Sequence, residues 1–150
     1  MACMRSMLIV MVALWGGWTA DSALAATRSL SLSAPASVST GAGITIEVSA
    51  DTTAGGGERI GFLHGEYSTD GGRTWTGFCY ENNIGPSDTR RLDLKAGAAG
   101  STVQVRARVA FRDGLAGDVD YRGAAIRWHE TWGKWREPPA KSVTITVTAE

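Results

Sequence analysis

Cysteine is scarce in this sequence of 150 residues, which holds only two. Cys3 lies in an apolar segment at the N-terminus, so Cys79 is the only cysteine of the remaining chain. One cysteine cannot form an internal disulfide, and the stability of the fold must therefore come from packing. We interpret Cys79 as a small buried apolar residue. A thiol that links to another chain or to a cofactor is the alternative, which the acidic neighbour Glu81 does not favour.

Histidine is equally rare, and the common catalytic patterns are missing. His64 and His129 stand without the HExxH spacing or the paired cysteines of zinc sites. The chain also has no Gly-x-Ser-x-Gly elbow and no glycine loop of the phosphate-binding type. His64 and Glu66 would share one face of a strand, and we interpret them as a solvated or edge-strand pair in preference to a proton-transfer pair. We expect neither an enzyme nor a bound cofactor.

The chain has no excess of charge of either sign, since 15 lysines and arginines balance 15 aspartates and glutamates. A neutral surface gives no reason to expect nucleic acid or an anionic membrane as the partner. We therefore expect a protein or a glycan as the partner, and no nucleic acid.

A long apolar run occurs only at the N-terminus. Residues 7–18 are almost entirely apolar, follow Arg5, and precede a polar stretch that ends in Ala23, Leu24 and Ala25. The run is about a dozen residues, whereas a membrane-spanning helix needs roughly 20, and the small residues suit signal peptidase. We predict a cleaved signal peptide over residues 1–25, a single domain over residues 26–150, no membrane span, and export to the periplasm or the medium.

The remaining chain is rich in alternation of apolar and polar residues, which is clearest over residues 103–111. Such runs indicate antiparallel strands with one buried and one solvated face. Seven strands are predicted, near residues 30–32, 44–48, 60–67, 74–80, 91–95, 103–111 and 142–148. Seven short strands with almost no helix signal predict an all-β fold, a single antiparallel two-sheet β-sandwich.

This arrangement resembles fibronectin type III and bacterial immunoglobulin-like domains. Residues 100–109 look like the penultimate strand of such a domain, and Trp135 with Pro138 resembles the Trp-x-x-Pro segment before its final strand. The resemblance implies an immunoglobulin-like sandwich. It says little about activity, because such sandwiches serve many functions.

Residues 68–75 join two of the predicted strands through Asp-Gly-Gly, a strong hairpin signal. The spacing of Ser68, Asp70, Gly72 and Trp75 resembles the Asp-box hairpin of sialidases and related propeller proteins. The resemblance implies a structural role, in which Asp70 accepts hydrogen bonds from turn amides and Trp75 packs beneath the hairpin. One copy in about 125 residues is too little for a propeller. A similar hairpin occurs in the dimerisation domain of the sulfite oxidase family. This resemblance implies self-association, so a homo-oligomer is one possible state of the protein.

Three tryptophans fall within eight residues, at Trp128, Trp132 and Trp135, with His129 among them. They would form an exposed aromatic platform for a sugar or a protein partner, or else cover one open end of the sandwich. For the three tryptophans together, and above all for Trp135, we favour the second possibility, a cover over one open end. If any of them form a binding surface, Trp128 and Trp132 are the better candidates. Their i, i+4 spacing suits one helical turn.

Residues 113–120 place Asp113, Asp118 and Asp120 in one glycine-containing loop. Oxygen clusters of this kind bind calcium in extracellular proteins. The spacing does not match the EF-hand, and acidic turns are common without metal. We treat the loop as a weak calcium candidate and expect no metal.

These observations lead to a functional prediction. We expect a non-enzymatic exported module for protein interaction, adhesion or envelope structure. The alternative is a carbohydrate-binding module that uses exposed Trp128 and Trp132.

Overall fold

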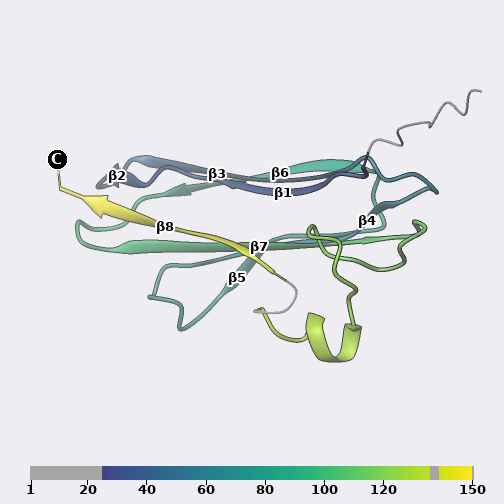
Figure 1. Ribbon diagram of the computed structural model, residues 1–150. Coiled ribbons are helices and arrows are strands. Elements are labelled where there is room, and N and C mark those ends of the chain that lie inside the picture. Colours follow the sequence, from purple (N-terminus) through teal and green to yellow (C-terminus); the bar gives the residue numbers. More distant parts are fainter. Residues whose placement is uncertain (1–24, 136–138, 150) are drawn as a thin grey trace, which may run out of the picture.

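The computed structural model describes residues 25–135 and 139–149, and within these ranges the chain is all-β with two sheets. The two sheets lie over one another as two layers (Figure 1), so the predicted all-β, two-sheet fold is confirmed. The described residues form eight strands, one more than expected. They are β1 (Arg28–Ser33), β2 (Ser37–Ser39), β3 (Gly43–Thr52), β4 (Arg59–Ser68), β5 (Thr76–Asn82), β6 (Ser87–Lys95), β7 (Thr102–Arg112) and β8 (Lys141–Thr148).

The smaller sheet has the order β1-β3-β6 and is antiparallel throughout. Its central strand β3 alternates strictly, so Ile44, Ile46 and Val48 are buried while Thr45 and Glu47 face solvent. One face of this sheet therefore contributes to the core and the other is polar, as the sequence pattern predicts.

The larger sheet has the order β2-β8-β7-β4-β5. The additional strand β2 pairs in parallel with β8, with Val38 opposite Val147. It is only three residues long and lacks a sustained alternation, which is why the sequence pattern does not reveal it. The hairpin strand β5 begins at Thr76, later than expected, because Thr74 and Trp75 belong to the turn.

Apolar side chains from both sheets fill the space between the layers. The largest fully buried ones include Phe111, Ile60 and Leu63 from one sheet and Ile44 from the other. Cys79 belongs to this core at 3% exposure, and burial raises the pKa of its thiol to about 11. A thiol buried in this way behaves as a small apolar residue.

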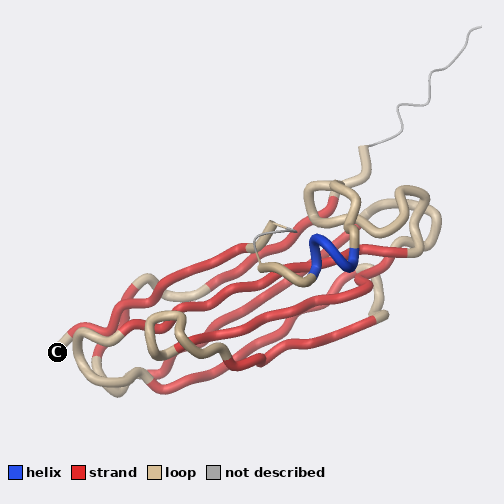
Figure 2. The backbone as a smooth tube through the Cα atoms, turned by 90° about the horizontal axis from the view of Figure 1, so that it is seen from below, coloured by secondary structure: helices blue, strands red, loops and turns tan. Residues whose placement is uncertain are grey.

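β7 departs from simple alternation over its second half. Residues 107–111 are all buried, including the cationic Arg108 at 5% exposure. A strand buried on both faces must have a cover on the side away from the core. That cover is the segment 128–135, which begins with a five-residue π-helix, η1 (Trp128–Trp132), lying across the strands of the larger sheet (Figure 2).

No helix within the described residues is long and apolar enough to cross a membrane.

Candidate functional site

The outer face of the larger sheet carries an unusual set of outward-facing side chains. The β4–β7 register places Glu66 opposite Arg106, and His64 opposite Arg108. On the far side of β4, His64 is opposite Tyr80 of β5. Alternate residues of a strand point to the same face, so these groups form one continuous polar and aromatic surface.

Two arginines of β7 and three indoles form a stack on this face. The guanidinium carbon of Arg106 lies 3.8 Å from the ring centroid of Trp75 and 4.1 Å from that of Trp135. The guanidinium carbon of Arg108 lies 4.3 Å from the Trp135 centroid and 4.2 Å from the Trp132 centroid. Each contact of this kind contributes about 0.5–2 kcal/mol when partly desolvated. We call these five residues the arginine–tryptophan stack.

Arg108 also fixes the covering segment through its backbone. Its Nη1 donates hydrogen bonds to the carbonyl oxygens of Trp132, at 2.6 Å, and Lys134, at 3.3 Å. At the other end of the segment, the indole nitrogen of Trp128 donates to Asp118. Arg112 joins this end, 5.0 Å from the Trp128 ring centroid. The tryptophans are therefore held in place from both ends.

Arg108 is buried without a carboxylate partner among the described residues, and its Nε has no hydrogen-bond partner there. Burial lowers the pKa of its guanidinium to about 10. A buried cation that is not neutralised in this way makes the surrounding potential positive. The indole faces, the two carbonyls and the His64 ring stabilise its charge.

His64 connects the two arginines. Nη2 of Arg108 is 3.3 Å from Nδ1 of His64, which assigns Nδ1 as the acceptor and places the proton on Nε2, 3.4 Å from Glu66. Burial first, and then the charge of Arg108, lower the pKa of His64 to about 4. Glu66 also accepts two hydrogen bonds from Arg106, at 2.6 and 2.9 Å. The histidine is consequently neutral at pH 7 and belongs to a closed polar network.

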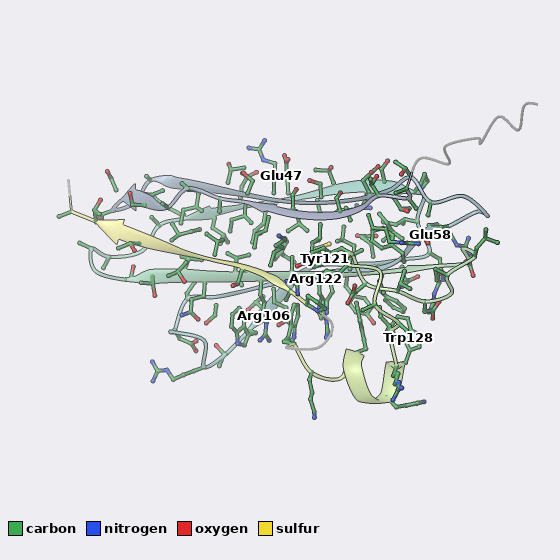
Figure 3. All side chains as sticks on the ribbon, viewed as in Figure 1. Glu47, Glu58, Arg106, Tyr121, Arg122 and Trp128 are labelled. Carbon is green, nitrogen blue, oxygen red and sulfur yellow. The ribbon has the colours of Figure 1, made fainter. Side chains whose placement is uncertain are left out.

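A pocket of about 540 Å³ opens beside one end of the stack. Its lining consists of Trp75, Arg106, Arg122, Trp135, Pro139, Ala140 and Ser142. Figure 3 shows Arg106 and Arg122 close to one another near the start of β8, on the side of the molecule away from Glu47. Pockets of this size accept small organic molecules.

Arg122 is the cation of this pocket whose guanidinium forms no ion pair with a carboxylate of the described residues. Its amide hydrogen-bonds to Asp120, but no carboxylate of the described residues accepts a hydrogen bond from its guanidinium, whose carbon lies 5.5 Å from the Tyr121 ring centroid. Arg106, by contrast, is enclosed by two indoles and Glu66. An incoming anion would therefore meet Arg122 first.

The hairpin 68–75 forms one wall of the pocket through Trp75. Oδ1 of Asp70 accepts the amides of Arg73 and Thr74, both at 2.9 Å, and Oδ2 accepts the Thr74 hydroxyl at 2.6 Å. The amide of Gly72 donates to the Ser68 hydroxyl. The Trp75 ring lies against the hairpin, where its indole nitrogen donates a hydrogen bond to the carbonyl oxygen of Gly72 at 3.1 Å. The ring is half-buried and also stacks on Arg106, over the outer face of the sheet.

The three tryptophans singled out from the sequence lie together, but not where we expected. Trp128, Trp132 and Trp135 are half-buried and cover the outer face of the larger sheet, instead of an open end of the two layers. His129 is exposed on η1. The arginines between the indoles were not among the site residues predicted from the sequence. The available signal was the Arg-x-Arg alternation of β7, which places both guanidinium groups on one face.

The carboxylates of Asp113, Asp118 and Asp120 do not converge on one site. Asp113 pairs with Arg59, Asp118 with Arg112, and Asp120 accepts the amides of Arg122 and Ala124. Within the part of the chain that the structure describes, no group of three or more metal-ligating side chains is present.

A comparison with protein-family models finds no match, and neither does one with curated proteins. Among solved structures, superoxide reductase (neelaredoxin) from Ignicoccus hospitalis is similar over 81% of this chain and 83% of that chain, at 12% identity and a TM-score of 0.43. Two variants of it give TM-scores of 0.42 and 0.41. Spo0M, a sporulation control protein from Bacillus subtilis, is similar over 83% of this chain and 50% of its own, at 9% identity and a TM-score of 0.37.

These comparisons correct the predicted function. We expected a non-enzymatic module for protein interaction, adhesion or envelope structure, or else a carbohydrate-binding module. The matching structures named above are a redox enzyme and a sporulation control protein, which agree with neither expectation. At such low identities and TM-scores the likeness transfers no activity to this chain, and the functional argument depends on the site itself.

Proposed function

We propose that this protein binds a small organic anion in the pocket between the arginine–tryptophan stack and the start of β8. The observation that carries the proposal is Arg122, whose guanidinium lines the pocket and donates to no carboxylate of the described residues. A guanidinium of this kind favours a carboxylate or a phosphoryl group, to which it donates two parallel hydrogen bonds.

The rest of the lining suits the remainder of such a ligand. Trp75, Trp135, Pro139 and Ala140 offer apolar surface, and Ser142 adds a hydroxyl. Pockets with mostly apolar walls and a few polar groups are typical of small-molecule sites, in which the polar groups orient the ligand. The stack makes the walls rigid before binding, and this lowers the entropic cost of association.

We also propose that the two sheets form an immunoglobulin-like sandwich of an exported protein, cleaved after residue 25. The face-to-face sheets and the alternation of β3 support the sandwich, and the apolar run followed by small residues supports export. The mass and N-terminal sequence of the protein purified from its native host test the cleavage. A chain that retains Met1 would contradict it.

Titration calorimetry with benzoate and phenyl phosphate tests the binding. We expect saturable binding of at least one of them at one site, weakened about 10-fold or more in Arg122→Met, since a hydrogen-bonded charged pair contributes roughly 1.5–3 kcal/mol. Lys95→Met removes one positive charge from the other sheet and is the matched control, which should bind as the parent does. Absence of binding by both probes, or equal binding by Arg122→Met, would overturn the proposal.

A further inference from the structure

Arg122 lies in a short turn, residues 120–124, whose base is fixed to the larger sheet. Just before the turn, Val119 exchanges two hydrogen bonds with Phe111 of β7, at 2.8 and 3.0 Å. Just after it, Ala125 bridges back to Val119. The position of the turn is therefore set by its base, whereas the direction of Arg122 depends on the course of the chain within the turn.

The side chain of Asp120 sets that course. Asp120 is buried, at 2% exposure, and its Oδ1 accepts the amides of Arg122, at 2.7 Å, and Ala124, at 3.1 Å. The main chain adds two hydrogen bonds, from the amide of Asp120 to the carbonyl oxygen of Ala124 and from the amide of Gly123 to that of Asp120, both at 2.9 Å. Both hydrogen bonds that the Asp120 side chain accepts within the described residues come from main-chain amides. The carboxylate therefore holds the backbone of Arg122 and leaves the guanidinium to the pocket.

The residues on either side of Arg122 restrict the turn further. Tyr121 packs against the core between the sheets, and Gly123 has a φ of 80°, a conformation that side chains other than glycine adopt at a cost. Arg122 itself is exposed and lines the pocket, close to Arg106 in Figure 3. A group whose backbone is ordered before binding loses less conformational entropy when the ligand arrives.

The charge of Asp120 acts in the opposite direction. A negative charge two residues from Arg122 weakens the attraction of the pocket for an anion. The amide hydrogen bonds need only an acceptor oxygen, which an uncharged amide side chain also supplies. The geometric contribution of Asp120 and its electrostatic contribution can therefore be separated by substitution.

We propose that Asp120 is a positioning residue of the pocket, whose buried oxygen fixes the turn 120–124 so that the guanidinium of Arg122 is presented to the bound anion. This inference rests on the proposed function and adds to it a residue that does not line the pocket. Asp120 acts through the backbone of Arg122 and does not contact the ligand.

Two variants of Asp120 carry the same loss of charge and differ in the acceptor. Asp120→Asn keeps an oxygen for the two amides, and Asp120→Ala has none. In calorimetric titrations of the full chain with benzoate and phenyl phosphate, Asp120→Asn should bind as tightly as the parent or more tightly. Asp120→Ala should bind at least about threefold more weakly than Asp120→Asn. Hydrogen exchange at the amides of Arg122 and Ala124 should be faster in Asp120→Ala than in Asp120→Asn.

A glycine variant perturbs the turn without changing any charge. Gly123→Ala places a methyl group 3.6 Å from Nη1 of Arg28, an ordinary contact, so its strain comes from the positive φ. It should weaken the binding of both probes severalfold. Gly117→Ala introduces the same strain at a φ of 73°, in a loop outside the described lining of the pocket, and should bind as the parent does. This pair of variants tests the positioning of the turn even if Asp120→Ala does not fold.

The outcomes separate this inference from the proposed function. Equal affinities of Asp120→Asn and Asp120→Ala would overturn the positioning role, and so would parental affinity in Gly123→Ala. Either result, together with weakened binding in Arg122→Met, would leave the proposed function standing. Absence of binding of both probes by the parent protein would overturn the proposed function itself.

Discussion

Nη1 of Arg108 donates a 2.6 Å hydrogen bond to the carbonyl oxygen of Trp132. The contact joins the central strand of the larger sheet to a residue that follows Arg108 by 24 positions along the chain. The same guanidinium lies between the rings of Trp132 and Trp135. One buried side chain thus supplies both the hydrogen bonds and the stacking that hold the segment 128–135, and with it one wall of the pocket.

Replacing this arginine should loosen the segment. We expect Arg108→Met to lower the free energy of unfolding by about 1.5–3 kcal/mol, because the carbonyls of Trp132 and Lys134 lose a charged donor. Tryptophan emission should shift to longer wavelength as the rings gain solvent. Urea denaturation and fluorescence measure the two effects. Arg91→Met, at an exposed arginine of β6, is the control and should change stability by less than about 0.5 kcal/mol.

A different outcome would show that the stack is dispensable. If Arg108→Met melts and emits as the parent protein does, the segment is held by other contacts, such as the hydrogen bond from Trp128 to Asp118.

Acid should destabilise the protein through His64. The pKa of this residue is lowered to about 4 by burial and by the charge of Arg108, whereas in the unfolded chain it is about 6.5. As the pH falls below 6.5 the unfolded state takes up the proton first. The stabilisation is therefore complete above pH 6.5 and is lost progressively as the pH falls to 4. A shift of this size corresponds to a loss on the order of 3 kcal/mol.

The groups that face His64 explain why protonation is unfavourable. Arg108 and Arg106 approach from β7, while Glu66 lies on the same strand and Tyr80 on β5. A second proton on the ring would sit on Nδ1, which would then be a donor facing the donor Nη2 of Arg108, and their hydrogen bond would be lost. Denaturation curves between pH 7 and 4.5 should show the loss in the parent and a much flatter dependence in His64→Gln. Parallel curves for the two proteins would rule out His64 as the origin.

Much of the fold follows from the sequence, because alternation reports directly which face of a strand is buried. Residues 103–111 predicted β7, and residues 60–67 predicted most of β4. The pattern does not report what covers the outward face. Arg108 is polar, so the alternation alone predicts that it faces solvent, but the segment 128–135 buries it. Only the tertiary fold brings these parts together.

The pocket could not be predicted from the sequence either, because only the tertiary fold brings its lining residues together. Trp75 comes from a hairpin, Arg106 from β7, Arg122 from a loop and Ser142 from β8. No local spacing connects four residues from four segments. The clustering of Trp128, Trp132 and Trp135 drew attention to the correct region. It did not show that arginines lie between the indole rings. Of the two arginines in the described lining of the pocket, Arg106 is held by indoles and Glu66, so Arg122 is the one available to a ligand.

The ion pair between Arg28 and Glu58 should stabilise the start of β1. The Glu58 side chain is completely buried between the layers (Figure 3), and Arg28 donates to both of its oxygens at 2.6 and 2.7 Å. Burial acts to raise the pKa of Glu58, but the hydrogen bonds from Arg28 and Thr52 and the charge of Arg28 outweigh it, so the pKa lies below its usual value. We expect Glu58→Gln to cost about 3–5 kcal/mol, because it leaves Arg28 without a counter-charge.

A double-mutant cycle isolates this pair. The double variant Arg28→Met with Glu58→Leu should be more stable than Glu58→Gln alone, since an apolar pair leaves no buried charge. Chemical denaturation of the parent, Arg28→Met, Glu58→Leu and the double variant gives the coupling energy. A coupling below about 1 kcal/mol, as for an exposed pair, would contradict the assignment.

The hairpin 68–75 should depend on the carboxylate of Asp70. Three hydrogen bonds from Arg73 and Thr74 converge on this group, together with one from the Ser68 hydroxyl, and they hold its pKa well below the usual range. We expect Asp70→Ala to lower the melting temperature and to speed hydrogen exchange at the amides of Arg73 and Thr74. Asp70→Asn should give values between those of the parent and Asp70→Ala, because its side-chain oxygen still accepts the amides.

The hairpin also positions Trp75 against Arg106, so its loss should reach the pocket. Asp70→Ala is expected to weaken the binding of phenyl phosphate by several-fold, although Asp70 itself does not line the pocket. Asp51→Ala, at an exposed aspartate of β3, is the matched control for both measurements and should affect neither. If amide exchange speeds up in Asp70→Ala while ligand affinity stays the same, the hairpin is a local structure and Trp75 stacks on Arg106 without its help.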